Sequence, residues 1–143
     1  MKRIYLAGPL FCEAETEYNL KVKEQLSEAG YEVVLPQENT MEFDSARMCE
    51  KEYSQDVADR ICANDFRLID SCDILVFNLD GRVPDEGACV ELGYAYAKGK
   101  PCFGLKTDIR ISEFGIDNIM IAGTLKGKIA RSIPELTGML DRV

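Results

Sequence analysis

The chain has 143 residues, enough for one compact domain with a hydrophobic core of its own. Hydrophobic residues make up 46% of it and charged residues 29%, and no apolar run approaches the ~18 residues that a bilayer-spanning helix needs. The formal net charge is −8 and there is no lysine and arginine cluster, which argues against polymeric nucleic acid as a ligand and favours a small, neutral or weakly charged molecule.

The residue types narrow the possible chemistry further. The sequence contains no histidine, which excludes Ser-His-Asp and Cys-His catalysis and leaves carboxylates as the most numerous candidate groups. Its six cysteines include no C-x-x-C pair, so we expect reduced, mostly buried thiols and neither a disulfide framework nor a zinc site. No metal or other cofactor is expected. The apolar stretch within residues 1–9 is too short for a secretion signal, so the expected location is the cytoplasm.

Apolar runs and helical patterns alternate along the chain. In order, they predict a strand over 2–8, a helix over 15–29, a strand over 31–35, an irregular polar segment over 37–46, a helix over 47–70, a strand over 73–79, a helix over 86–98 and a strand over 101–105. The stretch 106–127 is ambiguous, and we expect a loop there with a short fifth strand around 119–121. A last helix is predicted over 133–140.

Alternating strands and helices imply parallel strands joined by right-handed crossovers. The predicted fold is therefore α/β: a single open, mainly parallel five-stranded sheet with helices on both faces, of the flavodoxin-like or Rossmann-like kind. Without a repeat or a linker, residues 1–143 are expected to form one domain. Ligands of such sheets bind beyond the carboxyl ends of the strands. The turn after the first strand, residues 7–11, lacks G-x-G-x-x-G and a Walker lysine, so it gives no support to a dinucleotide or P-loop site.

The helices on either side of the third predicted strand carry acids among apolar residues. Glu91 shares a small apolar helix face with Gly87 and Ala88, where a carboxylate is costly to bury without a partner or a task. Asp65 falls within an apolar stripe that includes Tyr53, Val57, Ile61 and Leu68. Taken alone, each acid also fits a solvated position at the edge of its stripe.

Asp85 stands where a helix N-cap belongs, and a plain cap is its simplest explanation. Two inward acids on neighbouring helices can nevertheless meet at one pocket, and clustered buried carboxylates are candidate catalytic groups. Periodicity alone supports a possible carboxylate site and goes no further.

Five segments occur in the order in which the nucleoside 2-deoxyribosyltransferase family has them, and nearly the whole chain resembles that family. They are Tyr5-Leu6-Ala7-Gly8-Pro9, Asn64-Asp65, Pro84-Asp85-Glu86-Gly87, Glu91-Leu92-Gly93-Tyr94-Ala95 and Asn118-Ile119-Met120. The block from Asp85 to Ala95 is fairly specific, because it couples an acid, a glycine and the family's nucleophile at fixed spacing.

The resemblance implies a role for each matching residue. Glu91 resembles the nucleophile that attacks C1′ of a 2′-deoxyribose and forms a covalent ester. Tyr5 resembles the tyrosine that orients this carboxylate, and Asp65 and Asp85 match the acids that hold the base and protonate it as it leaves. Such a reaction requires an ionised nucleophile beside a protonated acid, so the environments of these carboxyl groups should push their pKa values apart. No cofactor is needed.

Further residues are implied to bind substrate. Gly8, Phe11 and Gly87 are expected near the bound nucleoside, with Phe11 a loose match. Asn118 and Met120 resemble the segment that enters a neighbouring subunit's site, where the asparagine binds the sugar 5′-hydroxyl. The implied partners are therefore a deoxynucleoside, a free nucleobase and further copies of the chain in a dimer or hexamer.

Several functions stay open. The deoxyribosyl intermediate can pass to a second base, which we expect, or to water. A subgroup of the family hydrolyses deoxynucleoside 5′-monophosphates, but Asn118 stands where that subgroup has a small hydroxylated residue that admits phosphate. Selectivity for purines or pyrimidines depends on residues 36–47 and 106–117, where the sequence departs from the best-known transferases. A non-catalytic module that binds a nucleoside or nucleotide as a signal is also compatible with the fold, but it gains nothing from a buried Glu91.

Overall fold

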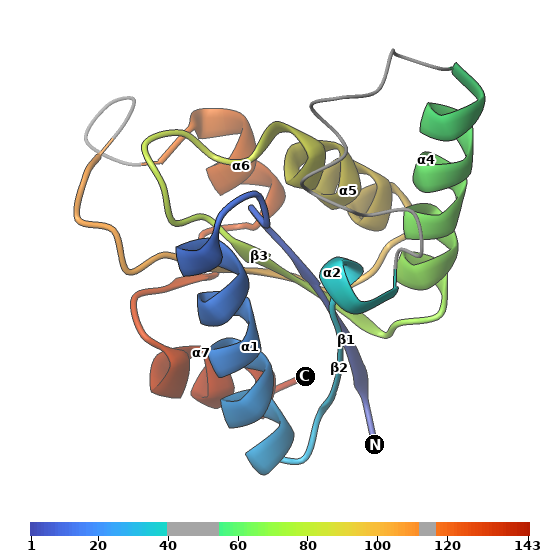
Figure 1. Cartoon of the computed structure of the whole chain (residues 1–143). Coiled ribbons are helices and arrows are strands. Elements are labelled where there is room, and N and C mark those ends of the chain that lie inside the picture. The colour runs from blue at the N-terminus through green and yellow to red at the C-terminus, as the bar shows by residue number, and fades with distance from the viewer. Residues whose placement is uncertain (40–54, 112–116) are drawn as a thin grey trace.

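The computed structural model describes residues 1–39, 55–111 and 117–143. The strands are β1 (Arg3–Ala7), β2 (Glu32–Val34), β3 (Ile74–Asn78), β4 (Cys102–Leu105) and β5 (Ile129–Ala130). The helices are α1 (Glu13–Glu28), α2 (Pro36–Asn39), α4 (Gln55–Asp70), α5 (Glu86–Ala97), α6 (Ile119–Thr124) and α7 (Ile133–Leu140). All five strands are parallel in the order β2-β1-β3-β4-β5, which confirms the predicted open α/β sheet (Figure 1).

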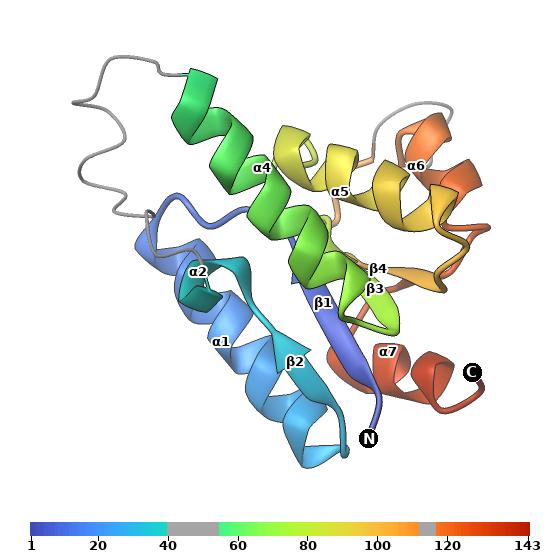
Figure 2. The ribbon, with the colours of Figure 1, turned by 90° about the vertical axis from the view of Figure 1, so that its right-hand side faces the viewer.

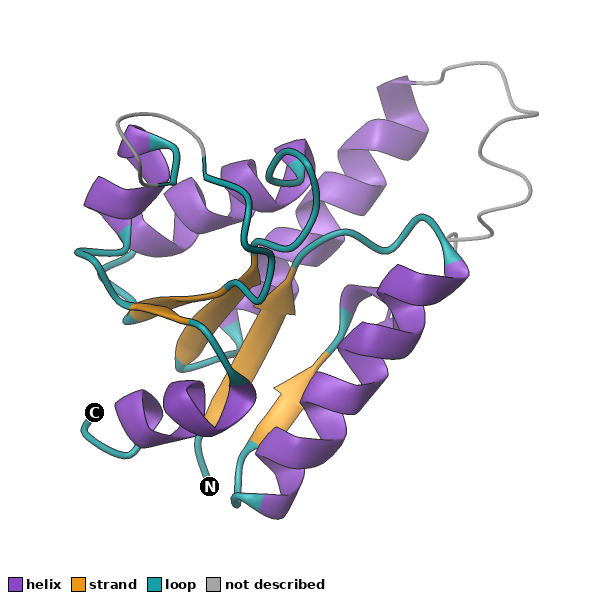
Figure 3. Ribbon diagram, turned by 90° about the vertical axis from the view of Figure 1, so that its left-hand side faces the viewer, coloured by secondary structure: helices purple, strands orange, loops and turns teal. Residues whose placement is uncertain are grey.

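Helices cover both faces of the sheet (Figures 2 and 3). Successive residues of a strand point to opposite faces, so β1 places Tyr5 and Ala7 in the core beneath α4, α5 and α6. Its Ile4 and Leu6 pack instead in the second core, against α1 and α7. All five residues of β3 are buried, as expected for a central parallel strand covered on both sides. Tyr5 thereby faces the helices that carry Asp65 and Glu91.

The expected fifth strand around residues 119–121 is wrong. These residues begin helix α6, because Oδ1 of Asn118 accepts hydrogen bonds from the backbone N–H groups of Met120 (3.0 Å) and Ile121 (3.3 Å) and so caps a helix. The fifth strand is β5, which pairs with β4 further along the chain. It has two residues, too few to show a strand periodicity.

Two other expectations are met only in part. The segment 37–46 was expected to be irregular, but its first residues belong to the short helix α2. The rest of that segment, the predicted helix start at residue 47 and Tyr53 of the apolar stripe lie outside the described residues. The helices within the described ranges include none with the length and apolar character needed to cross a membrane.

The cysteines in the described residues are free thiols, but they are less buried than expected. Cys72 and Cys102 are buried and Cys89 is half-buried, whereas Cys12 and Cys62 are exposed. The last two lie at the start of α1 and on the outer side of α4, away from the sheet. Cys49 falls outside the described residues.

Candidate active site

A cavity of about 160 Å³ lies at the carboxyl end of β1, between the loop that follows this strand and helices α2, α4 and α5. It is lined by Gly8, Leu10, Phe11, Pro36, Ile61, Asp65, Asp85, Gly87, Ala88 and Glu91. Six of the residues predicted for the site are therefore brought together there. The place agrees with the rule that open parallel sheets bind ligands beyond the carboxyl ends of their strands.

Glu91 and Tyr5 make direct contact at the floor of this cavity. Tyr5 is fully buried in the middle of β1, and its hydroxyl donates a hydrogen bond of 2.7 Å to Oε1 of Glu91. Burial, together with the negative charges of Glu91 and Asp65, raises the pKa of Tyr5 far above its usual value. Tyr5 therefore keeps its proton and acts as a fixed donor to the carboxyl group.

Burial also controls the charge of Glu91. It raises the pKa of this carboxyl from 4.5 to about 8, opposed by the hydrogen bond from Tyr5 and assisted by the negative charges of Asp65 and Asp85. At pH 7 only roughly a tenth of such a group is ionised. The sequence led us to expect an ionised carboxylate, and the difference arises mainly because burial disfavours the charged form of Glu91. The ionisable residues in the described lining are all acids, so none of them offsets this effect.

Asp85 and Asp65 reach the cavity from different helices. Asp85 caps α5, since its Oδ2 accepts a hydrogen bond of 2.8 Å from the backbone N–H of Ala88, which confirms the predicted cap. As a cavity residue it also lies within electrostatic range of Glu91. Asp65 lies on α4, which is held against α5 by the stacked rings of Phe66 and Tyr94, with centroids 4.1 Å apart. Among the described residues, no three acids or thiols lie close enough to hold a metal ion.

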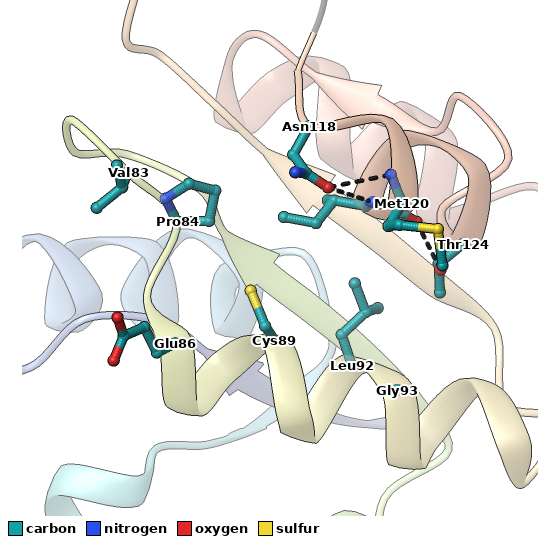
Figure 4. A pocket seen from close by; sticks show the side chains of 10 residues that line it. Val83, Pro84, Glu86, Cys89, Leu92, Gly93, Asn118, Met120 and Thr124 are labelled. Atoms are coloured by element: carbon teal, nitrogen blue, oxygen red, sulfur yellow. Dashed lines mark hydrogen bonds between the residues drawn. The ribbon is translucent and has the colours of Figure 1, made fainter. Parts of the chain in front are cut away.

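Asn118 and Met120 do not line this cavity. They border a separate hollow of about 600 Å³ between α5 and α6, across from Cys89 and Leu92 (Figure 4). The side chain of Met120 is 74% exposed. Within one chain, the residues expected to bind the sugar 5′-hydroxyl are thus on the other side of α5 from the Glu91 cavity.

A buried ion pair, which the sequence analysis did not identify, fixes the start of α6. Lys106 donates to Oδ1 of Asp117, and the side chains of these two residues are only 8% and 7% exposed. Arg131 adds a bond of 3.2 Å to the other carboxylate oxygen. Because Asp117 directly precedes Asn118, this pair determines where the capping asparagine lies.

The sequence analysis also missed part of the cavity wall and a cluster of buried amides behind it. Leu10, Pro36 and Ile61 supply apolar surface. Asn19 and Asn78 are 4% and 2% exposed and hydrogen-bonded to each other. The sequence did contain a signal for Asn19, because it precedes the core residues Val22 and Leu26 at helical spacing. A polar residue on an apolar helix face is the same pattern that drew attention to Asp65.

Known proteins resemble this chain over most of its length. The model of a family described as Nucleoside 2-deoxyribosyltransferase matches residues 4–124. The chain belongs to this family. An uncharacterized protein of Schizosaccharomyces pombe is 37% identical over 114 residues, which are 76% of this chain and 51% of that protein. The chain therefore spans about half the length of this curated relative.

Two solved structures are similar throughout. A conserved protein from Enterococcus faecalis V583 superimposes with a TM-score of 0.82 at 30% identity, covering 100% of this chain and 99% of that one. A 2-deoxyribosyltransferase from the psychrotolerant bacterium Bacillus psychrosaccharolyticus gives a TM-score of 0.75 at 25% identity, covering 94% of this chain and 90% of its own. The first similarity covers the whole chain and therefore includes the elements that build the Glu91 cavity.

Proposed function

We propose that this chain is a nucleoside 2-deoxyribosyltransferase that acts through a covalent deoxyribosyl ester on Glu91. The observation that supports this most strongly is the buried Tyr5–Glu91 hydrogen bond at the floor of a cavity that also contains Asp65 and Asp85. The family assignment supports an enzyme that transfers or cleaves glycosidic bonds. We further propose that residues 1–143 act as one domain.

In the proposed reaction, an Oε atom of ionised Glu91 forms a bond to C1′ of the deoxyribose while the C1′–N bond breaks. The electron pair of that bond passes to the base, which takes a proton from Asp85 or Asp65 as it leaves. A second base then attacks C1′ through a ring nitrogen, gives the proton of that nitrogen back to the same aspartate and releases the Glu91 carboxylate. Two displacements at one carbon give net retention of configuration, as in retaining glycosidases.

Tyr5 has a positioning and electrostatic task in this scheme. A hydroxyl that donates to Oε1 stabilises the ionised form of Glu91 and limits its rotation, which leaves the other carboxylate oxygen to face the sugar. A 2′-deoxy sugar suits the chemistry, because no electron-withdrawing 2′-hydroxyl opposes the positive charge that develops at C1′. The scheme needs no cofactor.

The activity test is incubation with deoxyinosine and adenine, followed by chromatography of the products. Formation of deoxyadenosine is the expected result. If hypoxanthine and free deoxyribose form without deoxyadenosine, the enzyme is a hydrolase and the proposed transfer is wrong. If deoxyinosine stays unchanged, the proposed enzymatic activity is wrong, and a nucleoside-binding module is the function that still fits. The Glu91→Gln variant, which keeps the side-chain shape and an acceptor for Tyr5, should lose activity by about 10⁴-fold or more.

We also propose that two copies of the chain complete each other's sites. Asn118 and Met120 lie outside the cavity of their own chain, and apolar side chains that line the hollow beside them are exposed. These are Val83 and Met120, which are 73% and 74% exposed. Exposed apolar residues grouped around a hollow are typical of an interface between protein chains.

A further inference from the structure

A hydrogen-bonded cluster of amide side chains lies behind the wall of the cavity. Asn78, at the end of β3, donates from Nδ2 to Oδ1 of Asn19 on α1 (3.2 Å). Asn19 donates from Nδ2 to the backbone carbonyl of Pro9 (2.9 Å) and to Oε1 of Gln37 (3.1 Å). Gln37 in turn donates from Nε2 to the carbonyl of Thr16 (3.1 Å). We call Asn19, Gln37 and Asn78 the amide relay.

The relay joins segments that are distant in sequence and carry one wall of the cavity. Pro9 lies in the loop of residues 8–11, which lines the cavity, and Gln37 directly follows the lining residue Pro36. The far end of this loop is held by Glu15, whose Oε2 accepts a bond of 2.7 Å from the backbone N–H of Phe11. The loop is therefore fixed by Asn19 near its start and by Glu15 at its end.

Close packing brings the same loop onto the end of β3. A Cβ atom at Gly8 would lie 2.8 Å from Cβ of Asn78, so the chain passes directly over this relay residue. Oδ1 of Asn78 also accepts from the backbone N–H of Asp80 (3.1 Å), at the start of the loop that leads to Asp85. One buried amide thus contacts both loops that border the cavity.

A buried cluster of this kind strongly restricts the positions of the segments that it joins. A buried amide that loses one partner leaves an unpaired donor or carbonyl, which is energetically costly, so alternative arrangements of the loop are disfavoured. Asn19 is 4% exposed, and its side chain bonds three of the segments around the cavity. It touches neither Glu91 nor any other acid of the site in the described contacts.

We propose that Asn19 is a positioning residue: through the amide relay it holds the loop of residues 8–11 and the start of α2 against the substrate. This inference rests on the proposed function. Breaking the relay moves the apolar wall relative to Glu91 without removing the Tyr5 hydrogen bond. Relay variants therefore lose kcat/KM, by about tenfold or more, while the pH dependence set by Glu91 stays where it is.

The loop can be observed without any enzyme assay, because the chain contains no tryptophan. Phe11 is 61% exposed and lines the cavity, so Phe11→Trp introduces a single tryptophan on the loop, which can be excited selectively over the six tyrosines. In this background we compare Asn19→Ala and Gln37→Met with Val22→Ala. Val22 is fully buried on the same helix α1 but is apolar, so its truncation weakens the core and leaves the relay intact.

Both relay variants should lower the fluorescence anisotropy and increase acrylamide quenching, while Val22→Ala should leave both near the parent values. The same substitutions in the Phe11 background are then compared for kcat, KM and the pH profile. Gln37 is only half-buried, so Gln37→Met should disturb folding less than Asn19→Ala. The test can therefore still be made with Gln37→Met if Asn19→Ala does not fold.

Unchanged fluorescence in the folded relay variants, or increased loop motion with kcat/KM equal to that of Val22→Ala, would overturn the positioning role. A parent protein that cleaves no deoxynucleoside overturns the proposed function instead. In that case the anisotropy comparison still decides whether the relay holds the loop.

Discussion

At the scale of single residues, Glu91 is subject to two opposing requirements. A nucleophile has to be ionised, whereas burial beside Asp65 and Asp85 raises its pKa to about 8. In the proposed reaction, the positive charge that develops at C1′ supplies the counter-charge that the acidic lining lacks. The ionised carboxylate is therefore stabilised more in the transition state than before it, which is the condition for rate acceleration.

This balance predicts the pH dependence of the reaction. Below pH 8 the kcat/KM should rise with pH, by up to about tenfold per pH unit, because the nucleophile has to be ionised and kcat/KM follows the ionisation of the free enzyme. Tyr5→Phe removes the hydrogen bond that lowers the pKa of Glu91, so the rise should move to higher pH and kcat/KM at pH 7 should fall roughly 10- to 100-fold. Initial rates between pH 5 and 10 measure both effects.

A matched control for this change lies on α5 itself. The hydroxyl of Tyr94 donates a bond of 2.9 Å to Asp70, which is exposed and outside the cavity. Tyr94→Phe makes the same chemical change and should leave the pH profile in place. An identical profile for Tyr5→Phe and Tyr94→Phe would mean that Tyr5 does not act on Glu91.

The raised pKa of Glu91 also predicts how its burial affects stability. Between pH 4.5 and 8 the unfolded carboxyl is ionised while the folded one retains its proton, so the folded state binds more protons and the free energy of unfolding falls as pH rises. Glu91→Gln cannot ionise. It should match the wild type below pH 4.5 and exceed its stability by on the order of 5 kcal/mol above pH 8, since the shift is about 3.5 pH units and each unit corresponds to about 1.4 kcal/mol. Urea titrations across this range measure the difference, and a constant offset between the two proteins would contradict it.

At the scale of elements, the buried Lys106–Asp117 pair predicts a large loss of stability when one partner is removed. Asp117→Asn leaves the ammonium group of Lys106 buried beside a neutral amide, which should cost about 3–5 kcal/mol in urea unfolding. The exposed Asp56–Arg60 pair on α4 provides the control, and Asp56→Asn should cost less than about 0.5 kcal/mol. Equal effects of the two substitutions would show that the buried pair has no special role in anchoring α6.

The elements also show how far the sequence alone leads. The first four strands and the helix at residues 133–140 could be predicted, because long apolar runs or a clear helical period are bounded by glycine or proline. Ile119–Ile121 misled us, since three apolar residues in a row fit a buried strand as well as a helix. The hydrogen bond that Oδ1 of Asn118 accepts from the backbone N–H of Met120 caps a helix here and so favours the helix over a strand. The true strand β5 is too short to be detected by its pattern.

The site was predictable where its residues break a pattern. Asp65 and Glu91 are acids on apolar faces, and both line the cavity. Tyr5 gave no such signal, because a tyrosine in a buried strand is ordinary, and it was placed only through the family resemblance. The amide relay was missed because neutral polar residues in a core attract less notice than charges. Their importance lies in hydrogen bonds between α1, α2 and β3, which no local pattern specifies.

At the scale of the whole molecule, the two hollows lie on opposite sides of α5. One contains the carboxylates, and the other is bordered by Asn118 and Met120. A single chain therefore separates residues that the family resemblance assigns to one site. The dimer that we propose would bring them together, because each chain would then offer the same α6 surface to its neighbour.

Complementation between two variants that we expect to be inactive on their own tests this arrangement. Glu91→Gln lacks the nucleophile, and Met120→Ala keeps it but shortens the side chain offered to the neighbour. In a mixed dimer, one of the two sites combines an intact Glu91 from one chain with an intact Met120 from the other. Random mixing should then restore up to about a quarter of the parent activity, because half of the dimers are mixed and one site in each is complete.

The comparison mixture is Glu91→Gln with Glu91→Ala, in which no site can be complete and no activity should return. If mixing Glu91→Gln with Met120→Ala gives only the average of the separate activities, each site is built within one chain. Full activity of Met120→Ala alone would remove this methionine from the site altogether. Restored activity would require that the hollow between α5 and α6 is covered by a second copy, since only a chain seated there can carry its Met120 to the partner's Glu91 cavity.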